Sequence, residues 1–344
     1  RLDVETDGRH AVVAFADSVD EDLARRDFTV NAMAWRPGTD ELRDPFDGAG
    51  DLEKRILRAV GEPERRFAED YLRVLRGLRF AGAYGLEIEE RTWSALLEAT
   101  ADLGRLSAER VREELLKVLA SDVPSAGLRL YGDAGALSIW YPELEAAASR
   151  PRWEQTLAAV DSIPAPRAIL RLTRLLLAID EPDAGARAAA ATALLQRLKF
   201  SNADTRRIQT LVAQYLPLLH PADSAARIRE WIHDVGAENC RDLFRLHFAM
   251  ARATGSGETG RALQYTWRRA HDELVRGSPV SLADLAVSGD DLIDLGIPRG
   301  PLIGLMLEEL IAQVLEAPAA NEREELLRRA RELIELGGLC LLYT

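Results

Sequence analysis

Apolar residues recur every three to four positions along most of the chain after residue 48, a spacing that predicts helices. The clearest apolar stripe follows Ser107, a residue suited to cap a helix, and consists of Val111, Leu115, Val118 and Leu119. Further helices are predicted over residues 301–315 and 321–336. The chain after residue 48 is therefore expected to be almost wholly helical.

One helix is predicted to run without a break from the Glu62-Pro63-Glu64 segment through Arg79 to Gly85. Proline early in a helix and acidic residues in its first turn both favour a start at this point. Glycine is common just after a helix, so Gly85 can end it. This helix matters because it carries most of the charged residues considered below.

The first 46 residues have a different pattern. Two short apolar runs, at residues 12–15 and 29–35, predict strands, and residues 44–48 predict a turn. Between the strands, residues 17–24 predict a helical turn capped by Asp17 or Ser18. The predicted fold class is therefore α+β and predominantly α.

Glycine and proline mark the expected connections between helices. Residues 121–144 are predicted to connect two helical blocks, because they contain Gly127, Gly132, Gly135 and Pro142. The helices that follow are punctuated by Pro164, Pro166, Pro182 and Pro217. A further loop is predicted over residues 253–257.

Composition narrows the class of protein. With 344 residues and 47% hydrophobic content, the chain suggests two to four domains. No apolar run approaches 18 residues, so no membrane span is predicted. The only two cysteines, Cys240 and Cys340, are far apart and suggest a reducing compartment, which favours the cytoplasm.

The formal net charge of −12 argues against a surface that coats nucleic acid everywhere, but it allows local basic patches. Residues 54–79 carry eight Lys or Arg against four Asp or Glu, and a second cluster consists of Arg197, Lys199, Arg206 and Arg207. We interpret both clusters as RNA phosphate contacts, with Arg206 and Arg207 as the RNA-binding candidates. Solvated helix faces are the alternative interpretation.

Two motifs carry the candidate chemistry. Residues 25–32, Arg-Arg-Asp-Phe-Thr-Val-Asn-Ala, place two guanidinium groups beside a carboxylate in a segment expected to be strand-like. Residues 69–80 place four charged side chains at intervals of three, namely Asp70, Arg73, Arg76 and Arg79. Guanidinium forks beside a carboxylate suit a nucleotide, because they can hold phosphates and can also read a base edge.

Together these motifs resemble the nucleotide-binding motifs of bacterial class II tRNA nucleotidyltransferases, the CCA-adding enzymes, and of the related bacterial poly(A) polymerases. The resemblance extends over most of residues 15–335 and includes the segments at 44–48, 57–62, 106–110 and 287–301. It implies a nucleotidyltransferase palm-like head followed by a helical neck, body and tail. The corresponding ranges are 1–60 for the end of the head, 61–125 for the neck, 126–250 for the body and 251–344 for the tail.

The resemblance also implies how a base is chosen without a template. On one helix, Asp70 and Arg73 would share a face. Asp70 only accepts hydrogen bonds and Arg73 only donates them, which matches the amino group and ring nitrogen of cytosine and adenine. Guanine and uracil present the opposite pattern and would leave polar groups unpaired, at roughly 1–3 kcal/mol each.

The remaining site residues follow from the matching motif positions. The resemblance implies that Arg26 and Asp27 contact the phosphates and ribose of the incoming nucleotide. Arg76 and Arg79 are expected either to contact the nucleotide or to hold the residues that contact it. Supporting roles are expected for Arg25, Asn31 and Glu69.

The implied reaction requires Mg²⁺, but the metal motif of the family does not occur among residues 1–344. We therefore expect the catalytic residues and metal ligands to precede Arg1, assign no metal ligand, and expect the given chain alone to be inactive. A His-Asp phosphohydrolase module, found in many family members, is rejected because His233-Asp234 and His271-Asp272 lack other suitable histidines nearby.

The predicted function is template-independent addition of C and A to the 3′ end of tRNA, with tRNA, CTP and ATP as partners. Residues 7–13 correspond to the flexible loop that CCA-adding members have before the first motif, but they are shorter and lack its proline, so a CC-adding enzyme is one alternative. A bacterial poly(A) polymerase is another. A non-catalytic RNA-binding protein remains the alternative from a different class.

Overall fold

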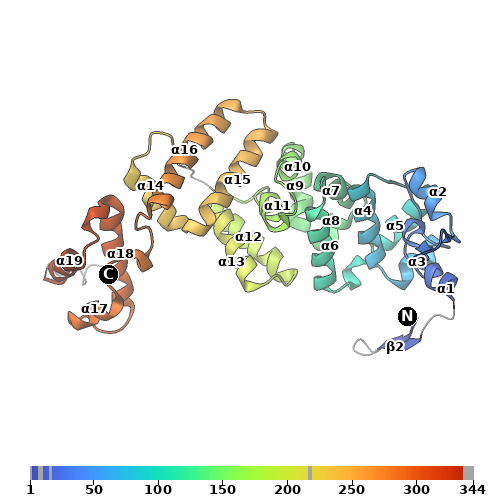
Figure 1. The fold of residues 1–344 in the computed structure, drawn as a ribbon, viewed down its shortest axis with the longest axis horizontal. Coiled ribbons are helices and arrows are strands. Elements are labelled where there is room, and N and C mark those ends of the chain that lie inside the picture. Colours follow the sequence, from blue (N-terminus) through green and yellow to red (C-terminus); the bar gives the residue numbers. More distant parts are fainter. Residues whose placement is uncertain (1, 7–10, 15–17, 216–218, 336–344) are drawn as a thin grey trace. The chain divides into compact units, whose positions relative to one another are not determined.

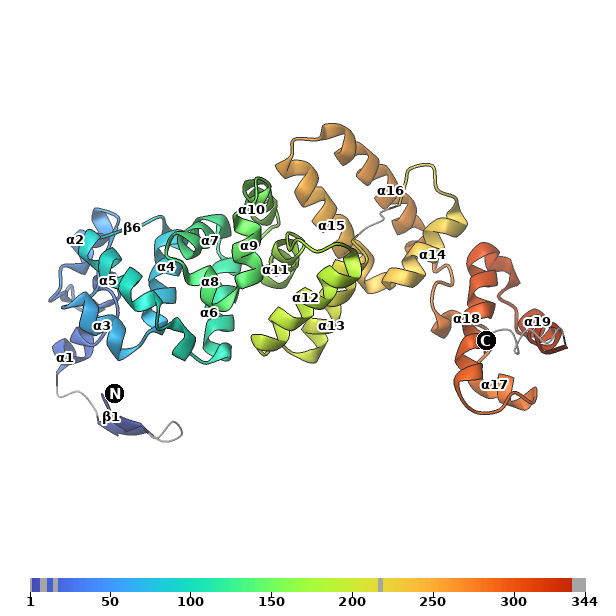
Figure 2. The same ribbon diagram turned by 180° about the vertical axis from the view of Figure 1, so that it is seen from behind.

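The computed structural model describes residues 2–6, 11–14, 18–215 and 219–335 and is predominantly helical (Figures 1 and 2). The chain divides into two compact units, Arg1–Val212 and Ala213–Thr344. The described strands are short and form three two-stranded sheets. The predicted α+β fold class with mainly α content is confirmed.

The first unit begins with the strands and turns that the sequence predicts. Their bounds are β1 Leu2–Thr6, β2 Ala11–Ala14, α1 Val19–Ala24, η1 Thr29–Asn31, β3 Ala34–Trp35 and β4 Leu42–Arg43. β1 pairs with β2 and β3 with β4, both antiparallel. Ser18 caps α1 as predicted, because its side chain accepts a hydrogen bond from the Glu21 amide at 3.2 Å. The alternative cap, Asp17, and the run at residue 15 lie outside the described residues.

The strand-like prediction for residues 25–32 is wrong for most of that segment. Arg25 ends α1, and only Phe28 makes an isolated antiparallel bridge, with Ala59. The chain then turns back as a 3₁₀ helix, in which the amide of Ala32 donates to the carbonyl of Thr29 at 2.9 Å. Backbone hydrogen bonds to Arg58 and Val60 hold Phe28 in an extended conformation, and the residues after it form the 3₁₀ helix.

The second motif lies on two helices. This part of the unit contains α2 Gly48–Glu53, β5 Ile56–Leu57, α3 Pro63–Glu69, α4 Leu72–Tyr84, β6 Glu87–Ile88 and α5 Glu90–Thr100, and β5 pairs with β6 in parallel. The predicted start at Pro63 and end at Gly85, which has φ +60°, are confirmed. The prediction of one continuous helix is wrong, because Asp70 is extended, with φ −158° and ψ 103°, between α3 and α4.

The predicted apolar stripe lies on α6 Ala108–Ala120 and is confirmed, because all four of its members are buried. The predicted connection over residues 121–144 is instead largely helical. The rest of the first unit consists of η2 Leu103–Arg105, α7 Pro124–Asp133, α8 Ala136–Trp140, α9 Pro142–Ala148, α10 Trp153–Asp161, α11 Ala168–Leu176, α12 Ala184–Arg197 and α13 Asn202–Ala213.

Two of the glycines in this unit serve close packing between helices rather than turns. A Cβ atom built on Gly82 of α4 would lie 2.4 Å from the Cα atom of Gly127 on α7. Without side chains at these positions the two helix backbones can approach each other directly. This explains why Gly127 lies within a helix although the sequence suggested a break.

We expect Gly82→Ala to lower the free energy of unfolding by about 1–3 kcal/mol, because the added methyl group forces α4 and α7 apart. Gly132→Ala is a matched control on α7, since its Cβ atom would meet nothing closer than Leu137 Cδ1 at 3.8 Å. That control should gain stability, by up to about 1 kcal/mol, from helix propensity. Urea unfolding of both variants tests the idea, which is refuted if both changes stabilise the protein.

A buried arginine forms hydrogen bonds with the ends of two other helices in the first unit. Arg171 of α11 is 1% exposed and donates hydrogen bonds to the carbonyls of Leu119, Ser121 and Ile163 at 2.6–2.8 Å. Burial lowers the pKa of the Arg171 guanidinium, which carries its charge among backbone dipoles instead of water. One side chain thus links α11 to the ends of α6 and α10.

The second unit is helical throughout the part that the structure describes. Its elements are α14 Ala225–Val235, α15 Ala237–Ala253, α16 Gly257–Arg276, η3 Leu282–Asp284, α17 Gly289–Asp294, α18 Pro301–Glu316, η4 Pro318–Ala320 and α19 Arg323–Glu335. The predicted loop at 253–257 and helix from Pro301 are confirmed. Buried Arg229 donates to the carbonyls of Leu315 and Glu316, at 2.6 and 3.0 Å, and pairs with Glu273.

Candidate nucleotide site

The first pair of site residues joins the end of the first motif to α4. Both Nε and Nη2 of Arg76 donate to Asp27 Oδ2, at 2.7 and 2.6 Å. The other carboxylate oxygen accepts from the Phe28 amide at 3.0 Å and from the Asn31 side chain at 3.2 Å. Asp27 is buried, whereas the Arg76 side chain is 31% exposed. The structure therefore brings together three of the predicted residues, Asp27, Arg76 and Asn31.

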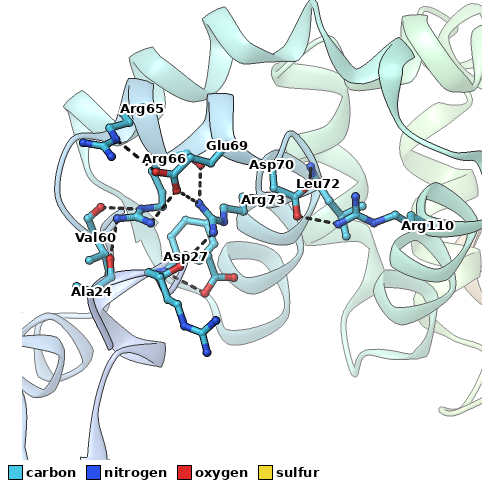
Figure 3. Close-up of polar contacts among 12 residues, drawn as sticks. Ala24, Asp27, Val60, Arg65, Arg66, Glu69, Asp70, Leu72, Arg73 and Arg110 are labelled. Carbon is cyan, nitrogen blue, oxygen red and sulfur yellow. Dashed lines mark hydrogen bonds and ion pairs between the residues drawn. The ribbon is translucent and has the colours of Figure 1, made fainter. Parts of the chain in front are cut away.

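A second cluster gathers three guanidinium groups around Glu69 (Figure 3). Arg66 and Arg73 contact Glu69 Oε2 at 2.9 and 2.8 Å, and Arg65 contacts Oε1 at 3.4 Å. Partial burial opposes ionisation of Glu69, but the hydrogen bond from Arg73 and the charges of its arginine neighbours outweigh burial and lower the pKa of Glu69. The acid thus stays ionised and holds Arg73 in place.

Backbone carbonyls complete this cluster. Arg66 donates to Ala24 at 2.7 Å and to Val60 at 3.1 Å, and burial lowers the pKa of its guanidinium. Arg73 donates to the carbonyls of Arg66 and Arg25 at 2.8 and 3.1 Å. The two arginines therefore join α3 and α4 to the residues that lead from α1 into the first motif.

Asp70 and Arg73 do not lie on one helical face, as the sequence predicted, because the helix breaks between them. Asp70 Oδ1 accepts a hydrogen bond from the Leu72 amide at 3.1 Å, at the start of α4. Its Oδ2 accepts from Arg110 Nη2 at 2.7 Å (Figure 3). The two predicted base-reading residues thus have separate partners on different elements.

Arg79 lies deeper than the other three members of the series. Its Nε donates to Glu114 Oε2 at 2.7 Å, and Lys117 contacts the other oxygen of Glu114 at 2.8 Å. Glu114 is 1% exposed and the Arg79 side chain 12% exposed. The Arg79 guanidinium also lies 4.1 Å from the ring centroid of Phe80, as in a cation–π contact. This geometry fits a residue that holds α4 against α6 on the buried side of the site.

Arg25 and Arg26 both pair with Asp22 on α1. Arg26 Nη2 lies 3.0 Å from Asp22 Oδ2, and the Arg26 side chain is 51% exposed. Hydrogen bonds from Arg25 and Arg26 lower the pKa of the Asp22 carboxyl. The exposed Arg26 is thus the one of the pair whose charge is open to a phosphate group.

Sequence reasoning did not single out Glu114 or Arg110. Glu114 occupies a position within the apolar stripe of α6, and a carboxylate among buried leucines is a signal that it has a cationic partner. Arg110 lies within the segment at 106–110 that resembles the family, but its partner is 40 residues away in sequence. That contact depends on how α6 packs against α4.

The RNA-binding candidates lie elsewhere in the first unit. Arg206 and Arg207 are exposed on α13, which lies apart from α3 and α4 in both views (Figures 1 and 2). Among the other members of the second basic cluster, Arg197 pairs with Glu143 and Lys199 pairs with Glu109. The structure therefore does not join this cluster to the nucleotide-site residues.

Within residues 2–6, 11–14, 18–215 and 219–335, no group of three or more His, Cys, Asp or Glu side chains is placed to hold a metal ion. Among the described residues, no helix combines the length and the hydrophobicity that a membrane span needs.

Three family models match this chain. A model described as "Poly A polymerase head domain" matches residues 1–58, and one described as "Probable RNA and SrmB-binding site of polymerase A" matches residues 85–148. A model of tRNA nucleotidyltransferase domain 2 matches residues 183–330. The first of these models contains the Arg25–Ala32 motif, so the fold, the motif and the models together define a nucleotidyltransferase.

Curated relatives narrow this class. The CCA-adding enzyme of Limosilactobacillus fermentum is 30% identical over 327 residues, covering 94% of this chain and 74% of the relative. That of Lactiplantibacillus plantarum is 30% identical over 321 residues, covering 93% and 73%. A solved CCA-adding enzyme of Bacillus stearothermophilus in complex with CTP is 25% identical, with a TM-score of 0.72, covering 94% of this chain and 77% of that one. The chain belongs to the CCA-adding enzyme family, which confirms the resemblance.

Proposed function

We propose that this protein adds C and A to the 3′ end of tRNA by nucleotidyl transfer from CTP and ATP, without a nucleic-acid template. The observation that carries the proposal is the unused hydrogen-bonding capacity of Asp70 and Arg73 at the junction of α3 and α4. Relatives named CCA-adding enzymes support it, as do the solved relative with CTP and a Thermotoga maritima relative with tRNA, the latter at the level of fold.

The capacity of the two side chains can be counted. Each carboxylate oxygen of Asp70 accepts one hydrogen bond from the protein and has a further lone pair for a ligand. Arg73 uses both N–H groups of Nη1 and one of Nη2, which leaves Nε–H and one Nη2–H. The free acceptors of Asp70 and the free donors of Arg73 are the groups that complement the amino group and ring nitrogen of cytosine and adenine.

The other residues have roles that suit their exposure. Arg26, which is half exposed, is proposed to bind the phosphates, and Asp27 with Arg76 to place the ribose. Arg79 supports Phe80 and α4 from below, while Arg25, Asn31 and Glu69 hold these groups in position. Mg²⁺ belongs to the proposal as the cofactor of the transfer, and none of the residues named here is proposed as its ligand.

The helical body, residues 126–250, and the tail, residues 251–344, are proposed to bind tRNA. The neck, residues 61–125, is proposed to carry the base-recognition helices, and residues 1–60 to form the end of the head. A tRNA substrate would place the reaction in the cytoplasm. If only C is added when CTP and ATP are both present, a CC-adding enzyme is favoured. If only A is added, a poly(A) polymerase is favoured.

The test is an incubation of the protein, expressed from its complete gene, with Mg²⁺, each NTP in turn and a tRNA lacking its 3′ CCA. CTP alone is expected to extend the tRNA by two C residues. CTP and ATP together are expected to extend it by C, C and A. Absence of any extension, with tRNA binding intact, would support the non-catalytic alternative.

We expect the Arg206→Ala, Arg207→Ala double variant to bind tRNA with a weaker salt dependence. Loss of two phosphate contacts should reduce the slope of log K against log[salt] by roughly two units. Binding is measured from 50 to 300 mM salt, with Arg36→Ala as control, because Arg36 is an exposed arginine that pairs with Glu41 and lies outside the ranges proposed to bind tRNA. An unchanged slope in the double variant would remove α13 from the RNA path.

A further inference from the structure

The side chain of Arg110 reaches from α6 to the break between α3 and α4 and contacts Asp70 there (Figure 3). Asp70 is not held by helical backbone, since its own backbone is extended. Its carboxylate is oriented from two sides instead, by the Leu72 amide on Oδ1 and by Arg110 on Oδ2. These two contacts determine which way the remaining lone pairs point.

The guanidinium of Arg73 has its own acidic partner, Glu69, and does not pair with Asp70. Arg73 is held by Glu69 and by two backbone carbonyls, none of which belongs to Asp70. An ion pair between Asp70 and Arg73 would use the same atoms that a base must contact. Arg110 thus binds Asp70, and Glu69 binds Arg73. Each contact leaves hydrogen-bonding groups of the base-reading residue available to a base.

We propose that Arg110 is a positioning residue for base selection, which holds Asp70 in the orientation that accepts an exocyclic amino group. The inference rests on the proposed function, because it requires Asp70 to read the base. A merely structural ion pair would behave differently. The pair is partly exposed, at 46% for Arg110 and 32% for Asp70, and such pairs contribute little to stability.

The test compares three variants of the protein expressed from its complete gene. Arg110→Gln removes the charge, and Arg110→Lys keeps it while losing the guanidinium fork. Arg43→Gln is the matched control, because Arg43 is 54% exposed, contacts an acid, Asp20, at 2.6 Å, and lies outside the ranges proposed to bind tRNA. The side chain of Arg43 contacts none of the proposed nucleotide residues in the described part of the chain.

The measurements are kcat and KM for CTP, ATP and UTP, the affinity for tRNA, and the melting temperature. Arg110→Gln should lower the preference for CTP over UTP by about tenfold, mostly through the KM for CTP. Arg110→Lys should recover part of that preference. The tRNA affinity and melting temperature of Arg110→Gln should match those of Arg43→Gln, which should keep the preference of the unaltered protein.

Two outcomes overturn the inference, and they can be told apart. If Arg110→Gln keeps its preference while Asp70→Ala loses it, then Asp70 reads the base without help from Arg110. If Asp70→Ala also keeps the preference, the proposed function fails at this site, and the inference fails with it.

Discussion

Glu114→Ala is expected to lower the free energy of unfolding by about 3–5 kcal/mol, because it leaves the largely buried Arg79 guanidinium without its counter-charge. Lys117 loses the same partner, but its side chain is 51% exposed and water can replace the contact. Urea unfolding followed by tryptophan fluorescence measures the loss.

Glu154→Ala is the control for this change. Glu154 also contacts an arginine at 2.7 Å in the same unit, but its side chain is 65% exposed. Its removal should cost at most about 1 kcal/mol. Replacing Arg79 and Glu114 together by Met and Leu should restore most of the stability, since no buried charge is left unpaired. Equal losses in Glu114→Ala and Glu154→Ala would contradict the argument from burial.

Asp70→Ala is expected to reduce the preference for CTP and ATP over UTP and GTP by about 100-fold. Each mismatched base leaves polar groups unpaired at roughly 1–3 kcal/mol, and the alanine variant no longer imposes that mismatch. The fold should persist, because Asp70 is on the surface of the α3–α4 junction. Incorporation of all four NTPs into tRNA lacking its 3′ end is the measurement.

Asp44→Ala is a useful comparison for this experiment, because Asp44 is likewise a capping carboxylate, accepting from the amides of Gly48 and Ala49 at 2.7 and 2.9 Å. It should lose about 1 kcal/mol of stability and none of the base preference. If Asp70→Ala behaves in the same way, Asp70 is a helix cap and not a reader of the base.

The sequence predicted the class of fold and the charged residues of the site better than it predicted their geometry. Helix ends at Pro63 and Gly85 follow from local chemistry, so they were predictable. The break at Asp70 was not, because residues 67–72 contain no proline or glycine and the apolar spacing continues through them. Contacts from Leu72 and Arg110 stabilise the extended residue, and the second of these is a tertiary contact.

The glycines of α4 and α7 illustrate the same limit. Glycine in a sequence indicates either a turn or a close approach of two backbones, and pattern alone favours the turn. Gly127 belongs to the second kind, since it faces Gly82 across the helix pair. Likewise, only the packing of α6 explains why Glu114 interrupts an apolar stripe. Contacts between residues distant in sequence decided each of these cases.

The contacts of Arg171 have a consequence for how this sequence can drift over evolutionary time. All three of its hydrogen bonds end on main-chain carbonyls, which every amino acid supplies. Positions 119, 121 and 163 can therefore accept new side chains without losing the bond, whereas position 171 cannot, because lysine has no fork to span three carbonyls. These hydrogen bonds therefore constrain the amino acid at position 171 alone, and co-variation between position 171 and its partners should be weak.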